Sequence, residues 1–151
     1  MIFRENGSKK PARFFYVLLC LVLTAAGFCA SAEGTSKLSR AEGARLGKKV
    51  KGIFEKKCAR CHTPDGSDRE KYKNEVDIDF ILNLKKLASN PDIISPGDPR
   101  GSGLYPQVED GSMPYSDTGE NHLPKEEKSI IEKWIKAGAP DEKGDLVPAA
   151  P

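Results

Sequence analysis

The sequence predicts a small all-α domain in which long loops join a few helices. Three stretches, residues 41–61, 77–89 and 124–137, carry apolar residues at spacings of three and four, which is the period of a helix with one buried face. Between the last two, residues 90–123 have no sustained period and hold five prolines and five glycines. The predicted order is helix, loop, helix, long loop, helix, and 151 residues suit a single domain.

The first 32 residues have the pattern of an export signal. Four basic residues precede an uncharged run from Phe14 to Phe28. Ala30-Ser31-Ala32 then supplies the small residues that signal peptidase recognises. We place the cleavage after Ala32 and expect a periplasmic protein. The apolar run is shorter than the roughly 20 residues of a membrane span, so we expect no integral span after cleavage. An uncleaved N-terminal anchor is the alternative.

The remaining chain divides into a flexible linker at 33–40, a domain at 41–140 and a disordered tail at 141–151. The signal removes four of the 24 Lys and Arg residues and one of the 22 Asp and Glu residues, which leaves a nearly neutral chain. No face or arm is strongly basic, so we expect no nucleic-acid partner. We expect a monomer.

The first predicted helix runs from about Ala41 to Cys61. Its apolar stripe consists of Leu46, Val50, Ile53, Phe54 and Cys58. Lysines fall mainly off that stripe, at Lys48, Lys49, Lys51, Lys56 and Lys57. We interpret them as a solvated helix face, with a docking surface as the alternative.

The second predicted helix runs from about Asp77 to Ser89, and Asn90-Pro91 ends it, because the residue before proline disfavours the α region. Its buried side consists of Ile78, Ile81, Leu82 and Leu87. A structureless loop longer than about 15 residues is uncommon unless it is functional. We therefore expect the 90–123 loop to be ordered by wrapping a cofactor.

The third predicted helix has the clearest limits. Pro124 suits the first helical position, where its missing N–H costs nothing, and Gly138 and Pro140 stop the helix. Glu126 and Glu127 favour the positive end of the helix dipole. The buried stripe consists of Ile130, Ile131, Trp134 and Ile135.

Cofactor chemistry is indicated by Cys58-Ala59-Arg60-Cys61-His62. Once the signal is removed, Cys58 and Cys61 are the only cysteines. Two thiols three residues apart on a helical turn can form thioether bonds to the two vinyl groups of one haem, with His62 held under the iron as a ligand. The motif therefore predicts one covalent haem c, attached through Cys58 and Cys61.

Other interpretations of the two cysteines fit less well. A zinc site would need Cys58, Cys61, His62 and His122, whose histidines are far from finger spacing. A thioredoxin-like pair opens a helix, which lowers a thiol pKa, whereas this pair closes one. A structural disulfide is the remaining alternative.

The residues leave three options for the second axial ligand of the iron. Met113 lies in Gly111-Ser112-Met113-Pro114, a turn sequence without apolar periodicity, which favours a ligand over a core methionine. Thioether ligation favours reduced iron and raises the potential. His122 is the competing ligand, and an open site that binds a small molecule is a third option.

The downstream sequence resembles a family. Ser95-Pro96-Gly97-Asp98-Pro99, Leu104-Tyr105, Met113-Pro114 and Trp134-Ile135-Lys136-Ala137-Gly138-Ala139 follow the CxxCH motif. Over Gly47 to Pro140 this series is similar to the planctomycete-type cytochrome c domain, among the class I-like c-type cytochromes. The resemblance implies a small cytochrome c-like fold of three to five helices with long loops wrapping one haem. It also implies His62 and Met113 as ligands, and contact between the first and last helices near Phe54 and Trp134.

These features predict an electron carrier rather than an enzyme, with protein electron donors and acceptors as partners. The alternatives are an open-site haem protein that binds or senses a small ligand, and a docking module with a structural haem. We expect the Pro96 carbonyl to orient the His62 ring, and Arg60 to point into solvent. We interpret the polar stretch Asp65–Glu75 as a solvated loop.

Overall fold

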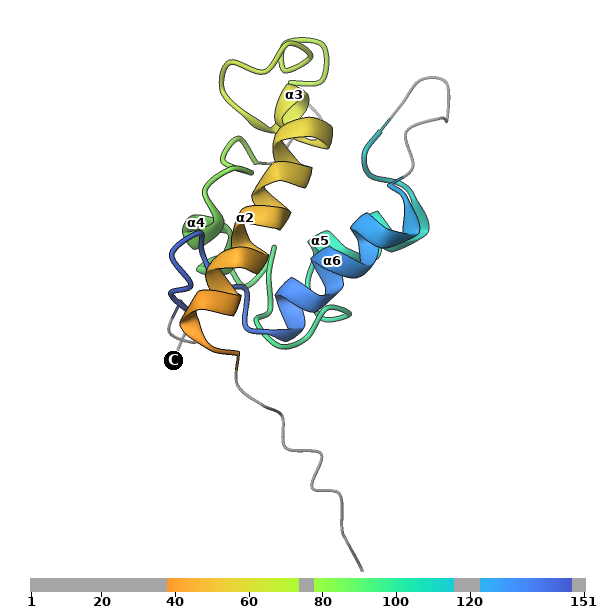
Figure 1. Ribbon diagram of the computed structural model, residues 1–151. Helices are drawn as coiled ribbons and strands as arrows, with labels where there is room; N and C mark the ends of the chain where they lie inside the picture. Colours follow the sequence, from red (N-terminus) through yellow and green to blue (C-terminus); the bar gives the residue numbers. More distant parts are fainter. Residues whose placement is uncertain (1–37, 74–77, 116–122, 148–151) are drawn as a thin grey trace, which may run out of the picture. The chain divides into compact units, whose positions relative to one another are not determined.

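The computed structural model describes residues 38–73, 78–115 and 123–147. These residues form α2 (Arg40–Lys57), α3 (Ala59–His62), α4 (Leu84–Ala88), α5 (Leu104–Asp110) and α6 (Lys125–Lys136) (Figure 1). The described ranges contain no strand, which confirms the all-α class for them. None of their helices is both long enough and apolar enough to cross a bilayer. The predicted signal and His122 lie outside these ranges.

Helix α2 begins with a capping box. The Glu42 amide donates to Ser39 Oγ, and the Ser39 amide donates to Glu42 Oε2 at 2.9 Å, so two otherwise unpaired donors are satisfied. The predicted helix continued to Cys61, but α2 ends at Lys57. Cys58 has φ −117°, well away from the helical value of about −63°, and α3 starts a new turn after it.

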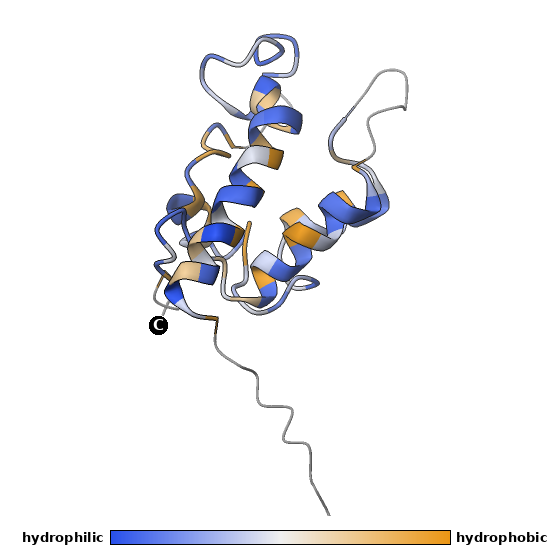
Figure 2. Ribbon diagram, viewed as in Figure 1, coloured by the Kyte–Doolittle hydropathy of each residue, from blue (hydrophilic) through white to orange (hydrophobic). Residues whose placement is uncertain are grey.

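Helices α2 and α6 pack against each other through aromatic side chains. The Phe54 and Trp134 rings meet edge to face, with centroids 6.0 Å apart and an interplanar angle of 87°, a favoured aromatic geometry. Both side chains are fully buried. Trp134 Nε1 donates to the Pro140 carbonyl at 2.8 Å, which satisfies its only donor. The predicted contact between the first and last helices is thus confirmed. In Figure 2, hydrophilic and hydrophobic residues alternate along both helices.

The limits of α6 match the prediction closely. Helix α6 begins at Lys125, so Pro124 is its N-cap rather than its first residue. Glu126 and Glu127 lie in the first turn, as predicted. The chain leaves the helix at Gly138, where φ is +88°, a conformation that favours glycine.

The middle of the chain differs from the prediction in two places. Instead of a helix over 77–89, the structure has only the short α4, because Asn83 caps it by accepting the Lys86 amide at 2.9 Å. Residues 78–83 before it are not helical. Inside the predicted long loop lies α5, which buries Tyr105 and Val108.

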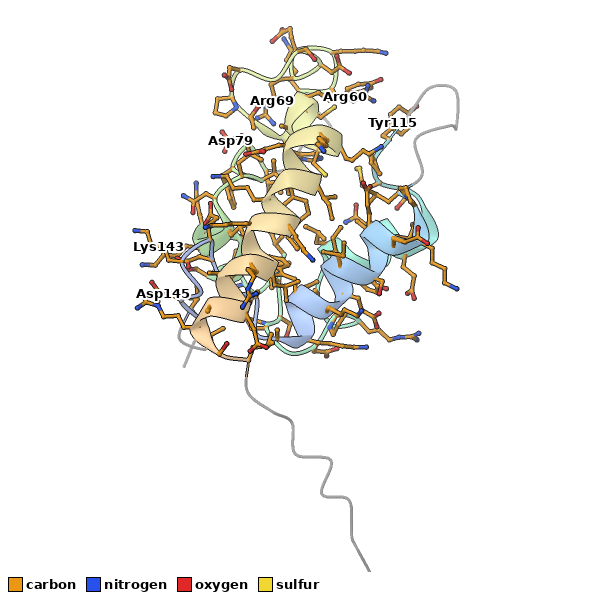
Figure 3. All side chains as sticks on the ribbon, in the orientation of Figure 1. Arg60, Arg69, Asp79, Tyr115, Lys143 and Asp145 are labelled. Carbon is orange, nitrogen blue, oxygen red and sulfur yellow. The ribbon has the colours of Figure 1, made fainter. Side chains whose placement is uncertain are left out.

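Residues 141–147, assigned to the disordered tail from the sequence, lie against α2. Lys51 pairs with Glu142 and Arg40 with Asp145, each at 2.9 Å (Figure 3). A Cβ on Gly47 would lie 2.4 Å from the Asp141 carbonyl oxygen, so only glycine allows this approach. Residues 148–151 lie outside the described ranges.

Candidate functional site

The CxxCH motif forms one compact turn at the end of α2. Cys58 is the C-cap of α2, and its amide donates to the Phe54 carbonyl at 2.9 Å. The Cys58 carbonyl then accepts two amides, from Cys61 at 3.1 Å and His62 at 3.0 Å. The backbone thus holds both thiols and the imidazole on a single turn.

The two cysteines are free thiols with no disulfide between them. Burial raises the pKa of Cys58 to about 12 and also raises the pKa of Cys61. The Glu127 carboxylate adds a smaller upward effect on Cys58. Redox-active CxxC pairs depend on a lowered thiol pKa, whereas the pKa values of both thiols are raised here.

The ring of His62 is oriented by a backbone carbonyl. Its Nδ1 lies 3.2 Å from the Ile78 oxygen. A carbonyl only accepts hydrogen bonds, so this contact places the hydrogen on Nδ1 and the ring lone pair on Nε2. The Ile81 amide donates to the His62 carbonyl at 3.2 Å, which holds the two segments together. Nε2 is therefore the nitrogen able to ligate a metal.

The orienting carbonyl is Ile78 and not Pro96, as we expected from the sequence. The loop that contains Pro96 is tied elsewhere, because the Gly97 amide donates to the Ile135 carbonyl at 2.8 Å. That bond holds the loop at the end of α6. The segment that follows the polar stretch instead runs beside His62.

Met113 is positioned by α5, the helix that the sequence prediction missed. The helix ends at Gly111, where φ is +84°, and the chain turns back on itself. The Met113 amide then donates to the Gln107 carbonyl at 2.9 Å, and the Ser112 amide donates to Asp110 Oδ1 at 2.8 Å. Met113 is thus held by the helix directly before it.

Two hollows surround these residues, and both are lined by Cys58, His62 and Met113. The larger contains about 1100 Å³ not filled by protein atoms, and the smaller about 660 Å³. Cys61 lines the smaller one. The four predicted site residues therefore meet around one space, although Met113 is distant in sequence from the other three. Apolar walls of the larger hollow come from Phe54, Ile78, Ile81, Ile93, Leu104 and Val108.

The described residues give no support to a zinc site. They contain no group of three or more His, Cys, Asp or Glu side chains placed to share a metal ion. His122, which a Cys2His2 site would need, lies outside the described ranges. One carboxylate oxygen, Glu127 Oε2, is buried without a hydrogen-bond partner among those residues.

Two arginines near the site make contacts that the sequence did not predict, although Arg60 is exposed, as we expected. Arg60 donates to the Tyr115 carbonyl at 3.1 Å and pairs with Asp68 at 3.4 Å (Figure 3). Arg69 approaches the Ile78 carbonyl, the acceptor of His62, at 3.4 Å. Their charge alone indicates solvent exposure, and no periodic pattern in the loops could have revealed these contacts.

No protein-family model matches this chain, and searches of curated proteins and of solved structures find no similar one.

Proposed function

We propose that this chain is a mono-haem c-type cytochrome that carries electrons outside the cytoplasm. One observation carries the proposal: Cys58, Cys61 and His62 share a turn, and Met113 from a distant segment lines the same hollow. The apolar walls of the adjoining larger space suit a flat, largely apolar porphyrin.

The haem would be held by four side chains. Each thiol of Cys58 and Cys61 would add across one vinyl group, so that an S–C bond forms and the thiol hydrogen passes to the neighbouring carbon, without an oxidant. This addition requires both sulfurs in the reduced thiol form, and Cys58 and Cys61 are not joined in a disulfide. His62 Nε2 and Met113 Sδ would hold the iron, and the haem would supply the one-electron couple.

The protein's own contribution is orientation. The Ile78 carbonyl holds the imidazole in one tautomer, which presents Nε2 and increases its basicity. The Met113 turn is closed by its bond to Gln107. Electron transfer requires neither a substrate pocket nor a catalytic base, so we propose a carrier that works with separate donor and acceptor proteins.

The first test is attachment. We would express the full chain in a host with an active haem-ligation system and measure the mass and spectrum of the exported product. We expect the mass of a chain starting at Glu33 plus one haem, and a Soret band. A bare chain without that band would overturn the proposal. Substituting both Cys58 and Cys61 by Ala gives the matched control, which we expect to lack covalent haem.

The second test is ligation by Met113. The oxidised protein should have the weak long-wavelength absorption band of methionine-ligated cytochromes. Met113→Ala should abolish the band and lower the reduction potential, because thioether ligation favours reduced iron. Ser112→Ala, next to it, should retain both properties. High-spin iron that readily binds carbon monoxide in the unmodified protein would instead favour the open-site alternative.

A further inference from the structure

Arg60 lies between the two cysteines and links the attachment turn to the Met113 segment. Its Nη2 donates to the Tyr115 carbonyl at 3.1 Å, across 55 residues of sequence. Its other terminal nitrogen, Nη1, lies 3.4 Å from Asp68 Oδ2. The guanidinium fork therefore joins three segments that are separate in sequence, and its planar geometry suits such bridging.

A second contact joins the same segments. The Tyr72 and Tyr115 rings meet edge to face with centroids 5.5 Å apart. Tyr72 belongs to the polar stretch that follows the motif, which we interpreted only as a solvated loop. Arg60, Tyr72, Met113 and Tyr115 all line the 660 Å³ hollow. The Met113 segment is thus fixed at Tyr115 by one hydrogen bond and one aromatic pair.

We propose that Arg60 is a positioning residue that holds Met113 at its place in the site. The inference rests on the proposed function, since it concerns the retention of Met113 as an iron ligand. Gln107 holds the Met113 turn on one side, through the Met113 amide. Arg60 holds it on the other side, through the carbonyl of Tyr115, which is two residues after Met113. Without Arg60, the segment keeps the aromatic contact but loses its charged hydrogen bond to the attachment turn.

The test measures how easily an external ligand displaces Met113. We would titrate the oxidised haem-bearing protein with imidazole and follow the loss of the methionine band. A hydrogen bond from a charged donor stabilises the segment, and the exposure of this one to solvent reduces its effect, so Arg60→Ala should bind imidazole about fivefold more tightly than the unmodified protein. Asp68→Asn, which loses only the partly exposed ion pair, should change the affinity by about twofold.

Two further variants keep the test decisive. Lys56→Ala removes the same charge from an exposed position nearby and should leave the affinity unchanged. Tyr115→Leu keeps the backbone acceptor of Arg60 but loses the aromatic pair, and should tighten imidazole binding several-fold, since edge-to-face aromatic pairs are stabilising. Far-ultraviolet circular dichroism checks that each variant is folded.

The outcomes separate the two proposals. If the unmodified protein lacks covalent haem or the methionine band, the proposed function fails, and this inference fails with it. If the band is present and Arg60→Ala binds imidazole no more tightly than Lys56→Ala, only the role of Arg60 is overturned. If Arg60→Ala is misfolded, Arg60→Gln, which removes the charge and keeps most of the side-chain stem, takes its place, and an imidazole affinity equal to that of Lys56→Ala overturns that role.

Discussion

Helix α2 and the turn that follows it are held in different ways. The packed part of α2 meets α6 through side chains that exclude water, such as Phe54 against the fully buried Trp134. At its C-terminal end, Cys58 and the α3 turn face hollows bordered by loops. There the segments are held by individual hydrogen bonds, such as His62 to Ile78 and Arg60 to Tyr115.

This difference shows how rigidity and access are divided. Close packing makes the packed part of α2 insensitive to any single polar contact. The turn that follows α2 depends on a few directional bonds and borders both hollows. Substitutions on the two sides should therefore differ in size and in cause.

The largest loss of stability should come from the packed part of α2, where it meets α6. Trp134→Ala removes a fully buried ring, its contact with Phe54 and its bond to the Pro140 carbonyl. We expect a loss of about 3–5 kcal/mol in the free energy of unfolding, measured by chemical denaturation. Lys133→Ala, an exposed change on the same helix, should stay within about 0.5 kcal/mol. Equal effects would show that the ring is not part of a packed core.

A pair of glycines on α2 sharpens the contrast. Gly47→Ala would place a Cβ 2.4 Å from the Asp141 carbonyl oxygen, so backbone must shift, and we expect a loss of about 1–3 kcal/mol. Gly52→Ala meets nothing within 4 Å and should stabilise the helix by about 0.5–1 kcal/mol. Thermal unfolding of both variants measures the sign. Two changes of the same sign would contradict the close approach at Gly47.

The loops provide a test of hydrogen bonding. Ser102 is 1% exposed; its Oγ accepts the Ser95 amide at 2.9 Å and donates to the Asp98 carbonyl at 2.8 Å. Ser102→Ala leaves the partly buried Ser95 amide without its acceptor, and we expect a cost of about 1–2 kcal/mol in chemical denaturation. Ser67→Ala, whose hydroxyl is exposed, is the control and should be nearly neutral.

The smallest effect concerns pH in the form with free thiols. Burial holds the pKa of Cys58 at about 12, above its ordinary value of 9.0. The folded state therefore binds this proton more tightly than the unfolded state does. The resulting stability is complete below about pH 9 and declines as pH rises toward about 12, and between pH 9 and 10 the loss is about 1 kcal/mol. Denaturation of haem-free protein at pH 9 and 10 should show this decline, and Cys58→Ala should reduce it.

The sequence predicted the parts of the fold that depend on repeated patterns. The stripe that includes Ile131, Trp134 and Ile135 identified α6, and those three residues are buried. Helix α5 was missed because Gly103 and Pro106 indicate a loop. Pro106 is tolerated there since it falls in the first turn, where amides have no helical partner. Leu104, Tyr105 and Val108, spaced as a short buried face, were the available signal.

The candidate site divides in the same way. The CxxCH spacing named Cys58, Cys61 and His62 directly, and their roles with Met113 remain predictions. Which carbonyl orients His62 depended on where the chain returns after the polar stretch, and no residue pattern encodes that path. The contacts of Arg60 and Arg69 were hidden for the same reason, because a charged side chain in a loop satisfies solvent and protein partners equally well.

The approach of residues 141–147 to α2 has a practical consequence. The Arg40–Asp145 pair connects the beginning of α2 to residues 141–147. Gly144, with φ +81°, has no room for a side chain near the Arg40 carbonyl. A shortened chain that stops at Pro140 would expose Gly47 and lose the Arg40–Asp145 and Lys51–Glu142 ion pairs. Affinity tags or fusion partners for purification should therefore be placed after Pro151, where they leave residues 141–147 in place.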